Sequence, residues 1–247
     1  MRGVWKFTLL EAKLLLREPI VVFFSLIFPL MSLFLFGTIY GNEPKSIFQG
    51  RGTIDISVPA FSVLTIATVG IGTIPSRIST YRERGILRRL CATPVRPFVI
   101  LGAQVVVHFA MTLLELILLL IAGHLVYQVR FDGNPVNVFL GFTLAAHSFF
   151  ALGFVIASLA RTAREAQIIS TVAFYPMIFL SGATIPIEIL PEGLRRYVGF
   201  LPLTHAVTLL RGLWFGETLR AHTKEVAILV GMLILSVIVS TKTFRWE

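Results

Sequence analysis

The chain alternates long apolar runs with short charged segments, and this pattern dominates the sequence. A helix needs roughly 20 apolar residues to cross about 30 Å of hydrocarbon, and six runs approach or exceed that length. They predict six transmembrane helices, at residues 19–42, 56–76, 98–127, 135–160, 166–187 and 224–242. The last run is short, and Lys224 and Lys242 at its ends can extend their ammonium groups to the membrane surface. We therefore expect an all-α integral membrane protein, with residues 1–247 forming one transmembrane domain.

Two further segments carry apolar faces but do not have the pattern of a span. In residues 1–18 the basic side chains fall along one stripe of a helix, and most apolar side chains lie away from it. This pattern predicts an interfacial helix whose basic edge faces the lipid headgroups. Residues 188–216 hold short apolar stretches between prolines, which predicts re-entrant helices that cap the extracellular exit before the last span.

The composition agrees with a membrane protein. Charged residues make up 14% of the chain, hydrophobic residues make up 55%, and the mean hydropathy is +0.83. A soluble domain carries about 25% charged residues. In a soluble protein the net charge of +9 would suggest a nucleic-acid partner, but here we assign it to membrane topology and to anionic lipid headgroups. The single cysteine, Cys91, cannot form an internal disulfide.

A basic loop separates the second and third apolar runs and holds six of the 22 Lys and Arg residues: Arg77, Arg82, Arg84, Arg88, Arg89 and Arg96. Lys and Arg are retained on the cytoplasmic side of membrane loops, so this loop places both chain termini in the cytoplasm. Residues 83–90 fit an amphipathic helix, with Leu87 on the apolar face and Arg84 and Arg88 away from it. Such a helix can dock into a groove of a partner protein. The alternative is a loop that lies on headgroups and only sets the topology.

Glu115 is the acidic residue inside an apolar run. Burying a carboxylate in a membrane is expensive, so Glu115 is a candidate for action on substrate or protons. Otherwise it pairs with a polar group of a neighbouring span, such as His147. His108 shares its helix face but His124 faces the opposite side, so the three cannot bind one metal ion from a straight helix. Because the sequence also lacks an HExxH pattern, we expect no metal site and no catalytic residue.

The chain has no GxxxxGK[ST] loop to hold nucleotide phosphates, so it does not hydrolyse ATP by that route. Small residues recur in two spans and allow helices to approach closely. In the fourth span, Gly141 and Gly153 favour packing inside the bundle. The second span is more polar than packing requires, which indicates a dimer face or a path for cargo.

Three motifs resemble the ABC-2-type permease family. The basic loop reads YRERGILRRLCATPVRP, and its Glu, Gly, Leu-Arg-Arg-Leu and Ala-Thr-Pro follow the order of that family's cytoplasmic motif. The start of the chain carries LLLREP and an aromatic span with FPL. The end carries FLSG, an IP-x-E-x-LP stretch, LPLTHAV and LLRGLWFG. The motifs come in order over nearly the whole chain. One departure is Ile86, where the family often has Thr, which slightly weakens the start of the loop helix.

The resemblance implies an ABC-2 (type V) exporter fold, a homodimer, and an ATP-binding subunit that carries ATP and Mg²⁺. This chain would then hold no cofactor and would not be an enzyme. The residues that match the family's coupling helix would dock into the ATPase subunit: Arg82, Glu83, Arg84, Gly85, Leu87, Arg88 and Arg89. The second and fifth spans of both copies would flank the translocation path, with five candidate residues: Ser62, Thr65, Thr73, Phe174 and Phe179.

We therefore expect the permease subunit of an ATP-driven exporter in a prokaryotic plasma membrane, in contact with lipids and not with nucleic acid. The start of the chain resembles the drug- and antibiotic-export branch of the family, which suggests an amphiphilic cargo. Two alternatives stay open. One is a lipid-linked polysaccharide or lipo-oligosaccharide moved by the same fold, and the other is proton-coupled secondary transport that uses Glu115.

Overall fold

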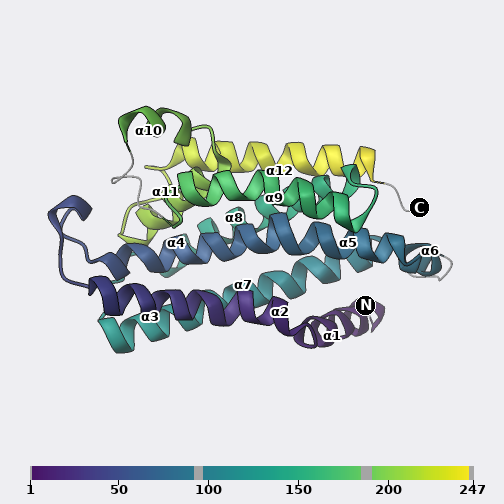
Figure 1. Cartoon of the computed structure of the whole chain (residues 1–247), viewed down its shortest axis with the longest axis horizontal. Coiled ribbons are helices and arrows are strands. Elements are labelled where there is room, and N and C mark those ends of the chain that lie inside the picture. Colours follow the sequence, from purple (N-terminus) through teal and green to yellow (C-terminus); the bar gives the residue numbers. More distant parts are fainter. Residues whose placement is uncertain (1, 92–96, 185–190, 245–247) are drawn as a thin grey trace.

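The protein is a bundle of helices that run side by side along one long axis (Figure 1). The computed structural model describes residues 2–91, 97–184 and 191–244. Within these ranges, five helical stretches are long and apolar enough to cross a membrane: Pro19–Tyr40, Thr53–Glu83, Val99–Tyr127, Pro135–Leu159 and Thr223–Thr243. They coincide with five of the six predicted spans. The described chain is therefore that of an all-helical, multi-pass membrane protein.

Two of the spans are continuous helices with a wider, π-helical turn inside them. The first consists of α2 (Pro19–Val22), η1 (Phe23–Ile27) and α3 (Phe28–Tyr40), and the second of α4 (Thr53–Ala67), η3 (Thr68–Thr73) and α5 (Ile74–Glu83). Each π-helical turn comes just before a proline, Pro29 or Pro75, whose missing N–H cannot complete an α-helical hydrogen bond. A local change of helical winding at this point accommodates the proline without interrupting the rod.

The second span is the centre of the bundle. In its most apolar stretch 89% of the residues are buried, against 22% in the first span and 11% in the last. Its neighbours are α3, α7 (Pro97–Tyr127), α8 (Pro135–Leu159), α9 (Ala163–Leu180) and α11 (Pro202–Trp214). η3 lies very close to α8, because a Cβ added at Gly153 would collide with the carbonyl oxygen of Gly70. The interpretation of Gly153 as a packing residue is confirmed.

The predicted span at residues 166–187 differs from the other five. The chain forms α9 here, which packs against α5 and η3 and runs along the bundle (Figure 1). With 18 residues that include Arg164 and Glu165, α9 does not reach the apolar composition of the other spans. Residues 185–190, the end of the predicted span, lie outside the described residues. A sixth span therefore stays a prediction.

The two ends of the bundle carry different short helices. We call one the α10 end, after α10 (Glu192–Val198), and the other the α6 end, after α6 (Ile86–Cys91). The N-terminal helix α1 (Arg2–Leu16) and the last turn of α12 (Thr223–Thr243) both lie toward the α6 end (Figure 1). Leu15 of α1 packs with Val107 and Met111 of α7, where the sequence predicts an interfacial helix. The position of α1 at a membrane surface, like the re-entrance predicted for residues 188–216, stays a prediction.

Asp55 joins three segments at the α10 end. Its carboxylate accepts hydrogen bonds of 3.0 Å from the backbone N–H groups of Gly52 and Arg130, and of 3.0 Å from the side-chain amide of Asn42. Asn42 in turn accepts from the N–H groups of Ile54 and Asp55, at 3.0 and 3.1 Å. These bonds satisfy N–H groups that the first turn of a helix leaves without a partner. The central helix is thereby fixed to the loops beside it.

The close contact between η3 and α8 generates a stability prediction. We expect Gly153→Ala to destabilise the protein by about 1–3 kcal/mol, because the new methyl group meets backbone that cannot rotate away. The measurement is the thermal unfolding midpoint of the protein in detergent. Gly231→Ala in α12 is the matched control, since nothing lies within 4 Å of the added Cβ there. Equal midpoints for the two variants would contradict the close packing.

Candidate functional site

Three hollows lie in a row along one face of the central helix, between the first span on one side and α9 with the residues that follow it on the other. The α10-end hollow measures about 410 Å³, the middle hollow about 240 Å³ and the α6-end hollow about 510 Å³. Neighbouring hollows share wall residues: Phe61 belongs to the first two, and Phe24 and Thr68 belong to the last two. The row therefore extends along the length of the central helix.

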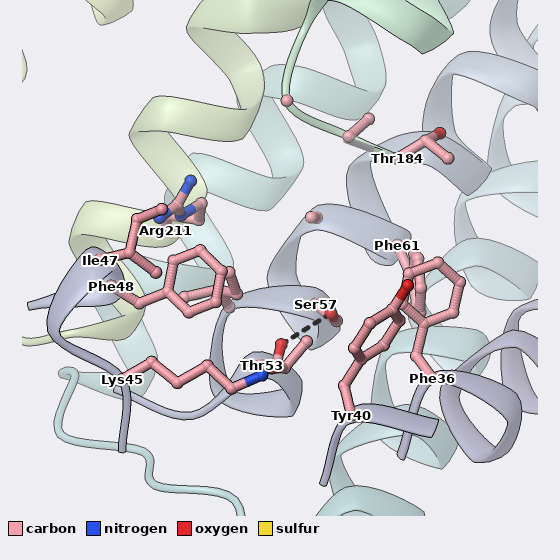
Figure 2. Close-up of a pocket in the computed structure, with 14 residues that line it drawn as sticks. Phe36, Tyr40, Lys45, Ile47, Phe48, Thr53, Ser57, Phe61, Thr184 and Arg211 are labelled. Atoms are coloured by element: carbon pink, nitrogen blue, oxygen red, sulfur yellow. Dashed lines mark hydrogen bonds between the residues drawn. The ribbon is translucent and has the colours of Figure 1, made fainter. Parts of the chain in front are cut away.

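The α10-end hollow carries both of its basic side chains on one side, next to Ile47 and Phe48, and further aromatic rings on the other (Figure 2). Lys45 and Arg211 lie on one side of it, and the rings of Tyr40 and Phe61 lie on the other. The Lys45 ammonium donates a hydrogen bond of 3.1 Å to the Thr53 hydroxyl. The hollow thus places positive charge next to an apolar surface.

The middle hollow is lined mostly by apolar side chains. Phe24, Phe28 and Phe174 belong to its wall, which comes from η1, α3, α4 and α9. The hydroxyl of Thr68, a polar member of the wall, donates to the carbonyl oxygen of Leu64 at 2.8 Å. This hydroxyl is therefore satisfied within its own helix, and the middle hollow favours apolar groups.

The α6-end hollow is polar and borders a buried ion pair. Arg77 lies 3.1 Å from the Glu11 carboxylate of α1 and 3.5 Å from the Glu18 carboxylate. The Tyr81 hydroxyl donates to Glu11 at 3.2 Å and accepts from the Arg77 guanidinium at the same distance. Burial raises the pKa of the Glu11 carboxyl, and the neighbouring Arg77 opposes that rise. The cluster joins the N-terminal helix to the central helix.

The structure brings together three of the five predicted path residues. Thr65 and Phe174 line the middle hollow, and Thr73 lines the α6-end hollow. Ser62 is fully buried and donates to the carbonyl oxygen of Val58 at 3.0 Å, so it lies on another face of α4. Phe179 is exposed at the end of α9 and belongs to none of the three walls as described.

Several residues that line the three hollows have no role assigned to them from the sequence. Phe24 and Phe28 lie one helical turn apart in the first span, and this spacing is a signal that could have found them. The sequence assigns no role to Lys45 or Arg211 beyond their positive charge. No sequence pattern brings those two together, because they lie in distant loop and helix segments.

The basic loop differs from its prediction in one respect. The sequence predicts one short helix over residues 83–90, but α5 continues from the span through Glu83 and a separate helix, α6, begins at Ile86. The break is at Gly85, whose φ of +64° is a left-handed conformation that glycine adopts without strain. Leu87 is buried against its own chain, while Arg84, Arg88 and Arg89 are exposed.

Arg82 and Glu83, two of the predicted docking residues, bind the turn between α8 and α9. The Arg82 guanidinium donates to the carbonyl oxygens of Ala157 and Ala160, at the C-terminal end of α8. The Glu83 carboxylate accepts from the N–H of Ala163, the first residue of α9, at 2.8 Å. A cation at a helix C-terminus and an anion at a helix N-terminus both complement the helix dipole. We call this arrangement the inner clasp.

The face of α7 toward the bundle interior carries four buried polar residues, Gln104, His108, Thr112 and Glu115. Both carboxylate oxygens of Glu115 lack a hydrogen-bond partner, although Thr65 of α4 interacts with this carboxylate. The sequence prediction that Glu115 and His108 share a helix face agrees with their common burial. Among the described residues, no three His, Cys, Asp or Glu side chains gather closely enough to hold a metal ion.

A multi-pass helical bundle with hollows beside its central helix is typical of membrane transport proteins. The sequence model of a family described as "ABC-2 type transporter" matches residues 4–215 of this chain. The chain therefore belongs to the ABC-2 type transporter family, which confirms the resemblance seen in its motifs.

Curated relatives agree with this assignment. ABC transporter G family member 20 of Dictyostelium discoideum is 29% identical over 189 residues, which cover 76% of this chain and 25% of that protein. The probable multidrug ABC transporter permease YbhR of Escherichia coli (strain K12) is 25% identical over 156 residues, 63% of this chain and 42% of that protein. The putative transport permease YvfS of Bacillus subtilis (strain 168) is 24% identical over 248 residues, 97% of this chain and 96% of that protein. The chain spans a quarter of the first relative and less than half of the second.

The buried ion pair between α1 and α5 generates the second prediction. We expect Arg77→Met to destabilise the protein by about 3–5 kcal/mol, because it leaves the Glu11 carboxylate buried without a compensating charge. The double variant Glu11→Met with Arg77→Met removes both charges and should recover much of the loss. Thermal unfolding in detergent measures both effects. A double variant no more stable than Arg77→Met would show that the two side chains do not depend on each other.

Proposed function

We propose that this chain is the transmembrane subunit of an ATP-driven exporter, which works as a homodimer with separate ATP-binding subunits. The observation that supports this most is the continuity between α6 and the central helix. α6 follows α5 directly after Gly85, and α5 is the end of the helix that backs all three hollows. A partner that displaces α6 would therefore displace a wall of the row.

The inner clasp would also connect movement of α6 to α9, which forms a second wall of the hollows. Glu83 holds the first residue of α9, and α9 contributes Phe174 to the middle hollow. Arg82 holds the end of α8 in the same way. Movement at α6 would thus reach α5, α8 and α9 together. In this proposal Arg82 and Glu83 transmit movement, and the exposed arginines of the loop meet the partner.

The exposed side chains beside α6 define the chemistry of the partner surface. Arg84, Arg88 and Arg89 are solvent-exposed, and the Arg89 guanidinium donates to the carbonyl oxygen of Arg84 at 3.0 Å. A partner would match them with an acidic groove, which would also steer its approach. The ATP and Mg²⁺ needed for transport would bind to that partner.

The proposal places the α6 end in the cytoplasm of a prokaryote and the α10 end outside its plasma membrane. The basic residues of α5, α6 and the N-terminal helix favour this orientation, since Lys and Arg are retained inside. The start of α1 and the end of α12 lie toward the same end of the bundle, as two cytoplasmic termini require (Figure 1). The basic stripe of α1 would contact lipid headgroups there.

The expected cargo is an amphiphile of drug or antibiotic type. The aromatic wall of the middle hollow suits an apolar body, and the name of one relative includes "multidrug". A second copy would cover the exposed apolar side chains of α9, such as Val172 and Tyr175, and would enclose the row. A lipid-linked polysaccharide or lipo-oligosaccharide is the alternative cargo for the same architecture.

The docking proposal generates the third prediction. We expect Arg88→Glu with Arg89→Glu to reduce recovery of the ATP-binding subunit roughly tenfold in co-purification, because the charge reversal opposes an acidic groove. Arg220→Glu, an exposed arginine toward the α10 end, is the matched control and should have no effect. The amount of permease in the membrane fraction must stay equal. Unchanged recovery of the ATPase with the double variant would refute docking at α6.

Glu115 supports one rival function, proton-coupled transport, because its carboxylate is fully buried and both oxygens lack a hydrogen-bond partner. We expect Glu115→Gln, which keeps the side-chain shape, to preserve ATP-driven transport in vesicles that contain the ATPase. Vesicles with the permease alone should show no transport under a pH gradient. Gradient-driven transport that Glu115→Gln abolishes would replace the exporter proposal with the rival one.

A further inference from the structure

The α10-end hollow combines two basic side chains with several aromatic rings in one small cavity. Fourteen residues line it, and they include two basic residues, Lys45 and Arg211, and no acidic residue among those described. Figure 2 shows these two side chains on one side, together with Ile47 and Phe48, and the rings of Phe36, Tyr40 and Phe61 on the other. Its volume of about 410 Å³ is within the range of small-molecule sites. A ligand that fills it would need a negative group at one end and an apolar group at the other.

Lys45 carries the electrostatic part of this inference, because its contacts are with neutral groups. Its ammonium donates to the Thr53 hydroxyl at 3.1 Å and lies 5.5 Å from the centre of the Tyr40 ring. The nearby cation Arg51 differs, because it pairs with the Asp132 carboxylate. A cation held by neutral partners in a concave apolar site produces a positive potential that attracts an anion. Thr53 also fixes the ammonium at the edge of the hollow, so the charge is held in place before a ligand arrives.

The hollow is continuous with the rest of the row. Phe61 forms part of the wall of both the α10-end hollow and the middle hollow. An apolar group in the middle hollow therefore lies next to the aromatic side of the charged one. Polar wall residues such as Thr53 and Ser57 lie in α4, and the Ser57 hydroxyl donates to the Thr53 carbonyl at 2.7 Å. That hydroxyl is satisfied, which leaves the Lys45 ammonium to recognise a head group.

We propose that the α10-end hollow binds an amphiphile with an anionic head, a carboxylate or a phosphate, held by Lys45 with its tail along Phe36, Tyr40 and Phe61. This ligand is either the exported cargo or an anionic lipid of the outer leaflet. That the hollow lies on the exit side of the translocation path rests on the proposed function. That the hollow prefers an anionic ligand does not rest on it.

The test uses the full-length chain without any ATPase, in nanodiscs of zwitterionic phosphatidylcholine. The probe is 11-(dansylamino)undecanoic acid, and its methyl ester is the uncharged probe. Trp214, one turn after Arg211 on α11, serves as the energy-transfer donor in a background where Trp5 and Trp246 are replaced by Phe. The signal then comes from a tryptophan near the hollow. Empty nanodiscs give the background of probe dissolved in lipid.

We expect the acid to bind at least roughly tenfold more tightly than the ester, and Lys45→Met to remove that preference, because the variant loses a charge-assisted contact. Lys45→Arg should retain it. Lys224→Met, an exposed lysine of α12 away from the hollow, is the matched control and should bind like the parent. Equal binding of acid and ester, or equal effects of Lys45→Met and Lys224→Met, would overturn the proposal.

A competition arm separates the two sources of the ligand. If phosphatidylglycerol in the nanodisc displaces the acid from the parent protein, the anionic amphiphile is a bilayer lipid. If it does not, the amphiphile is cargo. Both outcomes support an anionic head, and neither depends on an ATPase. Failure of the co-purification experiment would therefore remove the exporter proposal and leave this binding result intact.

Discussion

The rest of the structure depends on the burial of one continuous helix, Thr53–Glu83. A backbone in hydrocarbon must satisfy its own hydrogen bonds, so a central span has to stay helical throughout. The π-helical turn η3 before Pro75 preserves that continuity, and Gly70 within η3 lets α8 approach closely. The resulting rod extends from the Asp55 network at one end to Gly85 at the other. It places the three hollows on one of its faces.

Several charged side chains of this bundle lie beside a partner group of the same chain. Asp55, Arg82 and Glu83 bind backbone groups at helix ends, where N–H or carbonyl groups would otherwise be unsatisfied. Arg77 is buried only together with Glu11. Glu115 is the exception among these groups, because both of its oxygens lack a hydrogen-bond partner. Burying a carboxylate inside the bundle is expensive, so Glu115 is a candidate for a functional role, whereas the backbone contacts of Asp55, Arg82 and Glu83 already account for the positions of those side chains.

Much of the fold could be predicted from the sequence, because span length and apolar composition are local properties. The extent of the central helix could not. Arg77 looked like the start of a loop, and only its pairing with Glu11, far away in the chain, makes it a buried helical residue. The inner clasp was missed for the same reason, since the sequence shows that Arg82 and Glu83 are charged but not that the α8–α9 turn lies beside them. Ser62 is polar, as the path prediction requires, but its hydroxyl bonds to its own helix and it does not line the three hollows, which its sequence position alone could not reveal.

The polar contacts at the α6 end also bear on how such a row could open. The first span forms one wall of the row, and the ion pair between Arg77 and Glu18 joins it to the central helix. α9 forms the opposite wall, and the hydrogen bond from its first N–H to Glu83 joins it to the same helix. Both ties lie within a few residues of the loop that would meet the ATPase. A partner that moves α6 would therefore displace or break these two contacts first. The apolar side chains around the middle hollow would move only afterwards. In the proposed mechanism, the residues that lock the cytoplasmic end are the ones through which ATP-driven movement enters the membrane.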